Sequence, residues 1–282
     1  MFKLPIRVRR LCLVILFLTV QTHFVGRAQQ SPKHGWKLVW QDEFNARAGS
    51  PVDSRKWTAQ VGGHGWGNNE LQYYTDRIDN AFQSRGSLVI KAIREQYSGP
   101  AGVSRAYTSA RLITKNTFTS TFGRFEARIK LPRGQGIWPA FWLLGSDIDK
   151  VGWPKCGEID IMELIGKEPS TIHGTIHGPG HSGAKGLSSS YSLTQGKQFA
   201  DAFHVFAIEW ESGIVRFYCD DVLYKSITPA DLPNSATWVY DHPFFILLNV
   251  AVGGDWPGAP DATTIFPQTM LVDYVRVYQK AE

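Results

Sequence analysis

Three carboxylates lie close together in the segment GEIDIME. Apolar residues separate Glu158, Asp160 and Glu163, which is typical of a strand with one solvent-facing and one buried face. Glu158 and Asp160 share a face because strand side chains alternate with a period of two. Glu163 is out of phase by one residue, so we predict a β-bulge near Ile161 and Met162 that returns it to the face of Glu158.

Acids crowded onto one face repel one another, so a folded protein rarely keeps them there without a use. Such a set can cleave a glycosidic bond: one carboxylate attacks while another, kept protonated, donates to the leaving oxygen. A solvated strand face or a cation site is the alternative. The motif alone leaves these interpretations open.

The rest of the chain must supply a scaffold for this strand. Polar and apolar residues alternate along several segments, so we expect strands at residues 87–93, 124–131, 206–210, 215–219, 244–252 and 271–278. The strand at 124–131 should be half buried. Turns rich in Gly, Pro, Asn and Asp separate the strands, and no amphipathic helix exceeds about two turns. The pattern predicts an all-β sandwich of two antiparallel sheets, whose curvature would form a concave groove for a linear polymer.

The N-terminus has the composition of a secretory signal peptide. Basic residues precede an apolar run at residues 11–20, which is too short to span a bilayer in the usual way, and Gly26-Arg27-Ala28 is a small-x-small cleavage site. We expect a signal peptide at 1–28 and one domain at 29–282. The mature protein would be secreted or periplasmic, without a membrane segment.

Removing that segment changes the charge of the protein. The full chain carries a formal charge of +5, and five basic residues lie before residue 29 (Lys3, Arg7, Arg9, Arg10 and Arg27). The mature chain is therefore neutral and has no basic excess for binding nucleic acid. Cys156 and Cys219 remain after cleavage, and we expect buried free thiols, with a disulfide as the alternative. Without a Cys/His cluster at ligand spacing, zinc is not expected.

Aromatic residues are the outstanding compositional feature, with ten Trp, ten Tyr and 16 Phe in 282 residues. Exposed aromatic rings in secreted proteins commonly contact the apolar faces of sugars. For any single Trp, a place in the core is the more frequent outcome.

The catalytic segment and its flanks together resemble glycoside hydrolase family 16. The E-x-D-x-x-E pattern of residues 158–163 is similar to the bulged form of that family's signature. The other matching segments follow in the expected order: WGNNELQYYT (66–75), SARL (109–112), GRFE (123–126), GIWPAFW (136–142), GTIHGPG (174–180) and DYVRVY (273–278). The resemblance covers residue 36 to the end.

The resemblance implies a β-jelly-roll with a glycan cleft and retention of anomeric configuration. Segments 66–75 and 175–180 look like those of laminarinase-type endo-β-1,3-glucanases, so the implied substrate is a β-1,3-glucan. Lichenase-like β-1,3-1,4-glucanases usually lack the extra residue, here Met162, whereas agarase-like hydrolases share it. A non-catalytic β-glucan-recognition protein is a further alternative, although such relatives have lost catalytic acids. Hydrolysis and transglycosylation are not separated by the sequence.

The resemblance also implies roles for individual residues. Glu158 is the expected nucleophile, Glu163 the acid and then the base, and Asp160 a residue that orients Glu158 and keeps Glu163 protonated. His177 is expected on the neighbouring strand, bonded to Asp160 or to sugar, with a structural histidine as the alternative. The expected substrate-binding residues are Asn68, Arg111, Trp138, Trp142, Trp153, His177 and Trp256, where Arg111 has a structural ion pair as its alternative.

A calcium site on the convex side is also common in the resembled family. The matching positions are Glu43 and Gly86, through backbone carbonyls, and Asp273, through its carboxylate. Oxygen ligands from three segments suit Ca²⁺. We expect such an ion to stabilise the fold without taking part in the chemistry. We also expect a monomer.

Overall fold

A computed structural model describes residues 1–2, 35–100 and 102–281 of the chain. Almost all of the predicted signal peptide, including its cleavage site, lies outside the described residues. None of the helices in the described ranges is long and apolar enough to cross a membrane. Residues 35–100 and 102–281 belong to one compact unit.

Strands form nearly all of the regular structure, as the alternation predicted. The first nine strands are β1 (Trp36–Asp42), β2 (Thr58–Ala59), β3 (Gln72–Tyr74), β4 (Ala81–Ser84), β5 (Ser87–Ser98), β6 (Ser104–Ser109), β7 (Arg111–Ile113), β8 (Gly123–Lys130) and β9 (Ile137–Gly145). The others are β10 (Glu158–Glu163), β11 (Thr171–His177), β12 (Leu187–Ser192), β13 (His204–Glu211), β14 (Ile214–Cys219), β15 (Val222–Ile227), β16 (Phe244–Val252) and β17 (Gln268–Lys280). The helices within the described ranges are one-turn α1 (Ile148–Val151) and two short 3-10 turns, η1 (Gly183–Lys185) and η2 (Pro229–Asp231).

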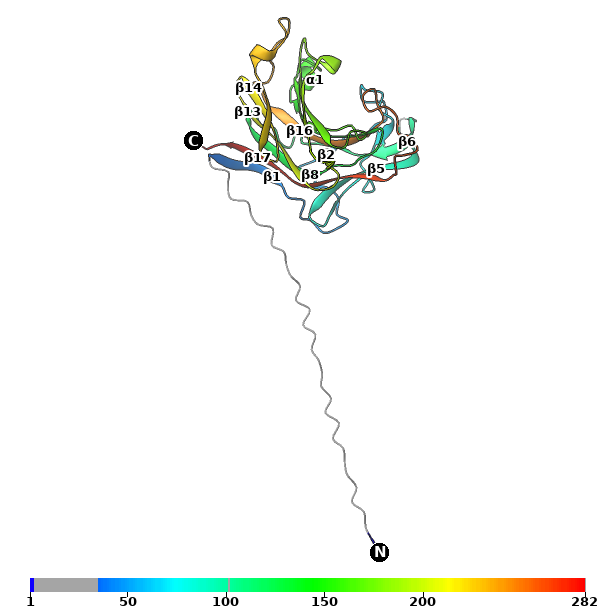
Figure 1. The fold of residues 1–282 in the computed structure, drawn as a ribbon. Coiled ribbons are helices and arrows are strands. Elements are labelled where there is room, and N and C mark those ends of the chain that lie inside the picture. The colour runs from blue at the N-terminus through cyan, green and yellow to red at the C-terminus, as the bar shows by residue number, and fades with distance from the viewer. Residues whose placement is uncertain (3–34, 101, 282) are drawn as a thin grey trace. The chain divides into compact units, whose positions relative to one another are not determined.

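The strands form the two sheets of the predicted jelly-roll sandwich. The larger sheet has the order β15-β14-β13-β8-β17-β5-β6-β3, with β1 on β17 and β4 on β5, and the smaller has the order β12-β11-β10-β9-β16-β7-β2. In Figure 1, β8, β17 and β1 lie in one layer and β16 in the other, while β14 and β6 mark opposite ends of the curved larger sheet. Pairing is antiparallel, except that β3 lies parallel to β6.

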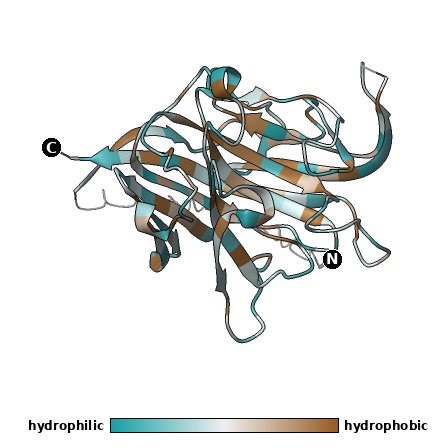
Figure 2. Ribbon diagram, turned by 90° about the horizontal axis from the view of Figure 1, so that it is seen from above, coloured by the Kyte–Doolittle hydropathy of each residue, from teal (hydrophilic) through white to brown (hydrophobic). Residues whose placement is uncertain are grey.

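The core lies between the sheets and explains the alternation. Phe125 and Ile129 of β8, Ile208 and Trp210 of β13, and Phe244 of β16 are fully buried. Brown and teal residues alternate along several of the strands in Figure 2, whereas β16 is buried along its whole length. Burial of this apolar surface is the main stabilising contribution to the fold.

The polar face of β8 differs from our expectation of a half-buried strand. Arg124 and Glu126 are each only 1% exposed, and their side chains form an ion pair of 2.8 Å. Arg124 also lies over the ring of Tyr218, and the Tyr278 hydroxyl approaches Glu126 from β17. The neighbouring strands therefore cover both charged residues. Cys156 and Cys219 are buried free thiols, as predicted.

Candidate active site

The predicted β-bulge is present in β10 and brings the three acids to one face. The register against β9 and β11 shifts between Asp160 and Glu163, where Ile161 and Met162 are both fully buried. Glu158 therefore lies opposite His177 of β11, and Glu163 lies opposite His173. The two buried side chains anchor the strand in the core, and the acids face away from the larger sheet.

Glu158, Asp160 and His177 form a tight cluster, with one polar atom of each within 4.8 Å of the others. The Nε2 atom of His177 lies 3.2 Å from Oδ2 of Asp160 and 3.9 Å from Oε1 of Glu158. The Glu158 and Asp160 carboxyls lie close enough for the charge of Asp160 to raise the pKa of Glu158, after the larger effect of burial. This is the predicted orienting contact between the two acids.

Burial and mutual repulsion raise the pKa values of all three acids. Burial, followed by the charge of Asp160, raises the pKa of Glu158 to about 8. Burial also raises the pKa of Asp160. The pKa of Glu163 lies well above its ordinary value because of burial, and the charges of Asp160 and Glu158 add to the effect. Carboxylates that share a low-dielectric site cannot all ionise together.

The surroundings nevertheless differ between the two ends of the strand. The Glu158 side chain is 17% exposed, against 4% for Asp160, and the charges of His177 and Arg111 favour its ionised form. Glu163 is 9% exposed. Of the two glutamates, Glu158 is therefore the one that ionises more readily and Glu163 the one that more readily keeps its proton, which are the two roles that glycoside cleavage requires.

Two tryptophans donate hydrogen bonds to the terminal acids. The indole N–H of Trp153 donates to Oε2 of Glu158 over 2.8 Å, and that of Trp138 donates to Oε1 of Glu163 over 3.0 Å. We predicted both residues as sugar contacts, and Trp153 as a rim residue. Trp153 remains 48% exposed, so its ring is accessible while its nitrogen is bound to the acid.

Trp142 lies on the same face of β9 as Trp138, because the two are four residues apart on a regular strand. The guanidinium of Arg111 lies between two indole rings, 4.8 Å from the centre of Trp66 and 4.7 Å from that of Trp142. Its Nε donates to Oε1 of Gln60 over 2.6 Å. Such a stacked cation is held in a fixed plane. Asn68 is exposed within the 66–75 segment, and its Nδ2 is 3.4 Å from Oε1 of Glu70.

Trp256 lies beside the Glu163 end of the site. Its ring makes edge contacts with Trp138 at 5.5 Å and with His173 at 5.0 Å. Burial lowers the pKa of His173, and its Nε2 is buried without a hydrogen-bond partner among the described residues. Our sequence analysis missed His173, although its spacing of four from His177 on one strand places both on the same face.

Comparison with known proteins agrees with this geometry. The profile of the family described as Glycosyl hydrolases family 16 matches residues 66–276. The chain belongs to this family.

Individual relatives cover the chain to different extents. A "Beta-glucanase" of Rhodothermus marinus is 42% identical over 294 aligned residues, covering 100% of this chain and 98% of that protein. The "Glucan endo-1,3-beta-glucosidase A1" of Niallia circulans is 38% identical over 264 residues, covering 87% of this chain but only 38% of that longer protein. The solved endo-beta-1,3-glucanase of Pyrococcus furiosus has a TM-score of 0.84 at 48% identity, covering 88% of this chain and 95% of that chain.

The family 16 chain brings its predicted calcium ligands to one stretch of β17. Asp42 lies opposite Val275, and Leu88 lies opposite Val272, so Glu43 and Gly86 come beside Asp273. The Glu43 carboxylate pairs with Arg276 at 2.7 Å, which leaves its backbone carbonyl as the possible ligand. Asp273 supplies the carboxylate but also accepts a 3.0 Å hydrogen bond from Arg128. These oxygen donors are of the type that calcium binds, and Arg128 competes with such an ion for the Asp273 carboxylate.

One other donor cluster occurs in the described ranges. Donor atoms of His204, Cys219 and Asp220 lie within 4.8 Å of one another. Here Asp220 already bonds His204 at 2.6 Å and the backbone N–H of Val205, and burial raises the pKa of the thiol. These contacts account for the cluster without a metal.

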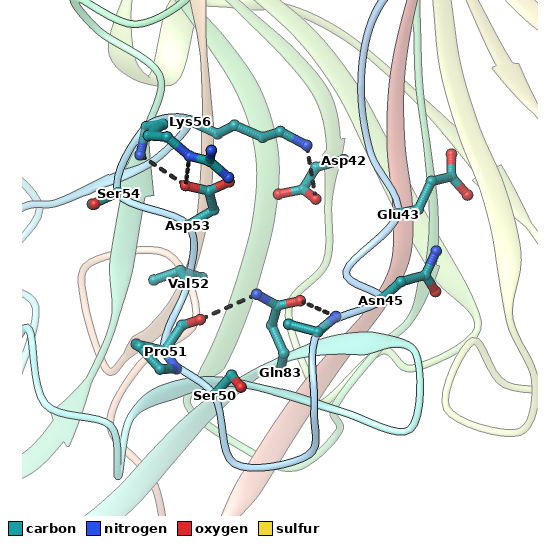
Figure 3. A pocket seen from close by; sticks show the side chains of 12 residues that line it. Asp42, Glu43, Asn45, Ser50, Pro51, Val52, Asp53, Ser54, Lys56 and Gln83 are labelled. Atoms are coloured by element: carbon teal, nitrogen blue, oxygen red, sulfur yellow. Dashed lines mark hydrogen bonds and ion pairs between the residues drawn. The ribbon is translucent and has the colours of Figure 1, made fainter.

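Two cavities lie away from the three acids of β10. The larger, about 570 Å³, is lined mainly by residues 42–56 together with Gln83. In Figure 3, Lys56 pairs with Asp42 at 3.2 Å within the wall, whereas Glu43 has no partner among the residues drawn. The smaller, about 400 Å³, lies beside residues 130–133.

Proposed function

We propose that this family 16 hydrolase is a retaining endo-β-1,3-glucanase that cleaves laminarin-type glucans. The observation that carries the proposal is the pairing of a more exposed, cation-supported Glu158 with a buried Glu163 on one face of a bulged strand. The match to a Beta-glucanase over nearly its whole length supports the substrate class.

In the first step, the carboxylate of Glu158 attacks the anomeric carbon and forms a covalent glycosyl-enzyme. The bond from that carbon to the bridging oxygen breaks, and Glu163 gives this oxygen its proton. The shorter glucan leaves with a new hydroxyl group. In the second step, ionised Glu163 takes a proton from water, whose oxygen attacks the same carbon and releases Glu158.

Asp160 and His177 prepare the two glutamates. The close approach of Asp160 to Glu158 orients the nucleophile. The Asp160 charge helps to keep Glu163 protonated, since it raises the pKa of that group. His177, 3.2 Å from Asp160, limits the repulsion within the cluster when it is protonated.

The sugar-binding residues surround the acids on the same sheet face. Trp138 and Trp142 offer rings from β9, Arg111 offers a stacked planar donor, and Asn68 offers an exposed amide. Trp153 and Trp256 offer exposed rings at the Glu158 and Glu163 ends respectively. Aromatic rings with a few polar donors are suited to a neutral glucan.

Hydrolysis of laminarin tests this proposal, with lichenan, agarose and carboxymethylcellulose in parallel. We expect rapid release of β-1,3-oligosaccharides by the mature protein and none by Glu158→Gln, with NMR showing the β-anomer first. Cleavage of a different polymer alone would replace the substrate assignment with a lichenase-like or agarase-like one. Laminarin binding without cleavage would identify a glucan-recognition protein. Longer products at high acceptor concentration would reveal transglycosylation.

We further propose that calcium binds through the carbonyls of Glu43 and Gly86 and the carboxylate of Asp273. A bound ion would stabilise the fold because it binds the folded state. After treatment with a chelator, calcium should raise Tm, and Asp273→Asn should remove that increase. An equal increase in the variant would contradict the assignment.

We also propose export, with residues 1–28 removed as a signal peptide. Expression of the full chain followed by N-terminal sequencing of the exported protein tests this. A mature protein that begins near Gln29 is expected, and an intact Met1 in the exported protein would contradict it.

A further inference from the structure

Behind the sugar-binding face lies a chain of buried polar side chains that does not include the catalytic acids. The indole N–H of Trp142 donates to Oδ1 of Asn249 over 2.7 Å. Nδ2 of Asn249 donates to the hydroxyl of Tyr74 over 3.1 Å. That hydroxyl is therefore free to donate its own hydrogen. Burial, followed by the charge of the nearby Glu70, raises the pKa of Tyr74 well above its ordinary value.

Glu70 connects the chain to the 66–75 loop. It accepts hydrogen bonds from Nε2 of Gln72 over 2.5 Å and from Nδ2 of Asn68 over 3.4 Å. Gln72 in turn accepts from the backbone N–H of Val252 over 2.7 Å, at the end of β16. These contacts thus connect the ring of Trp142 in the site to the exposed Asn68 beside it.

These groups are too deeply buried to be surface contacts. Tyr74 and Gln72 are fully buried, while Glu70 and Asn249 are 5% and 6% exposed. Buried polar groups are costly unless they are bonded, so the hydrogen bonds within this group hold one arrangement of its members. Removal of one of these contacts should therefore make both Trp142 and Asn68 less well fixed.

Arg111 depends on the same arrangement. Trp142 forms one side of its stack, and Trp66, the other side, packs against the Tyr74 ring at 5.2 Å. Glu70 is the countercharge that favours the ionised form of Arg111 within the site. Both rings and the charge around Arg111 are therefore fixed by members of the chain.

We propose that Tyr74, Asn249 and Glu70 are positioning residues that set the affinity for glucan by holding Trp142, Arg111 and Asn68. This inference rests on the proposed function. The Tyr74 hydroxyl lies behind the binding face, so its removal should weaken sugar binding without touching the acids.

Tyr74→Phe tests the inference, because it removes one oxygen atom and keeps the ring. Tyr274→Phe is the matched control: Tyr274 lies on β17 of the larger sheet, is 4% exposed, and its hydroxyl has no hydrogen-bond partner among the described residues. In the Glu158→Gln background, calorimetry with laminarihexaose should show Kd raised about fivefold to tenfold by Tyr74→Phe, equivalent to roughly 1–1.4 kcal/mol for one buried hydrogen bond. Tyr274→Phe should leave Kd unchanged.

The active enzymes provide a second measurement. Tyr74→Phe should raise KM by a similar factor while kcat changes less than about twofold, since the acids keep their geometry. Near-ultraviolet circular dichroism should change with Tyr74→Phe as the tryptophan environment loosens. An unchanged Kd, or a fall in kcat at constant KM, would overturn the inference.

A second variant covers the case in which Tyr74→Phe does not fold. Asn249→Leu removes the links to both Trp142 and Tyr74, so it should raise Kd at least as much. The double variant should bind no more weakly than Asn249→Leu alone, because both substitutions break one chain. Additive losses would show that the residues act separately. If the Glu158→Gln protein binds no laminarihexaose at all, the proposed function fails instead.

Discussion

Trp138 and Glu163 are joined by a 3.0 Å hydrogen bond from the indole N–H to Oε1 of the carboxyl. The donor comes from β9 and the acceptor from the position just beyond the bulge in β10. A residue proposed to bind sugar therefore also contacts the proposed acid. This bond lowers the pKa of Glu163, opposing the larger effect of burial.

Trp138→Phe should move the basic limb of the pH profile to higher pH. The substitution removes a bond that lowers the pKa of Glu163, so the acid keeps its proton further into the alkaline range. We expect kcat/KM at the optimum to fall by about tenfold, the equivalent of one hydrogen bond to a charged group. Profiles of kcat/KM against pH provide the measurement, and a basic limb displaced to lower pH would contradict the assignment.

Asp160→Asn should move the profile in the opposite direction. The charge of Asp160 raises the pKa of both Glu158 and Glu163, so its removal lowers both. Both limbs should therefore move to lower pH, and kcat should fall by about 10² because Glu158 loses its orienting partner. Unmoved limbs together with a lower kcat would restrict Asp160 to orientation alone.

Glu163→Gln should stabilise the protein at neutral pH. The pKa of Glu163 is raised in the folded state from an ordinary value of 4.5, so the stability it contributes is complete below pH 4.5 and declines as pH rises above it. Glutamine does not ionise and escapes this loss. Differential scanning calorimetry should show a higher Tm at pH 7 but not at pH 4, by ~2–4 °C for each kcal/mol recovered. Equal Tm values at pH 7 would contradict the raised pKa.

Arg124→Met should strongly destabilise the fold. The guanidinium bonds Glu126, Glu209 and Asp221 and is almost fully buried, so the buried Glu126 loses its cation. We expect the free energy of unfolding to fall by about 3–5 kcal/mol in urea titrations. The exposed Arg55, paired with Asp53, supplies the control, and Arg55→Ala should change little. Similar losses of unfolding free energy in both variants would contradict the conclusion that burial makes the Arg124 ion pairs more important for stability.

Local patterns were sufficient to predict several of the strands, the bulge and the face that carries the acids. Each depends on period-two alternation within one segment, and Glu163 was the one acid out of phase. The burial of Arg124 and Glu126 depends on Tyr218 and Tyr278, which arrive from strands far along the chain. A local sequence pattern does not show which distant residues will cover a side chain in the fold.

The links among Glu70, Tyr74 and Asn249 escaped the sequence for the same reason. Asn249 lies 175 residues from its partner Tyr74, and only the fold brings β16 to the 66–75 loop. Glu70 and Tyr74 were within a segment we had singled out, but their sequence spacing carried no sign that their side chains lie close together. Likewise, the bond from Trp153 to Glu158 depends on a loop conformation that alternation does not determine.

The bulge in β10 also determines where this strand can vary in length. Loss of either Ile161 or Met162 would restore plain alternation, and all three acids would still face outward. A residue lost or gained between Glu158 and Asp160 would instead turn one of them into the core. A single-residue deletion in the catalytic strand should therefore be tolerated only at the bulge, which Ile161 and Met162 form.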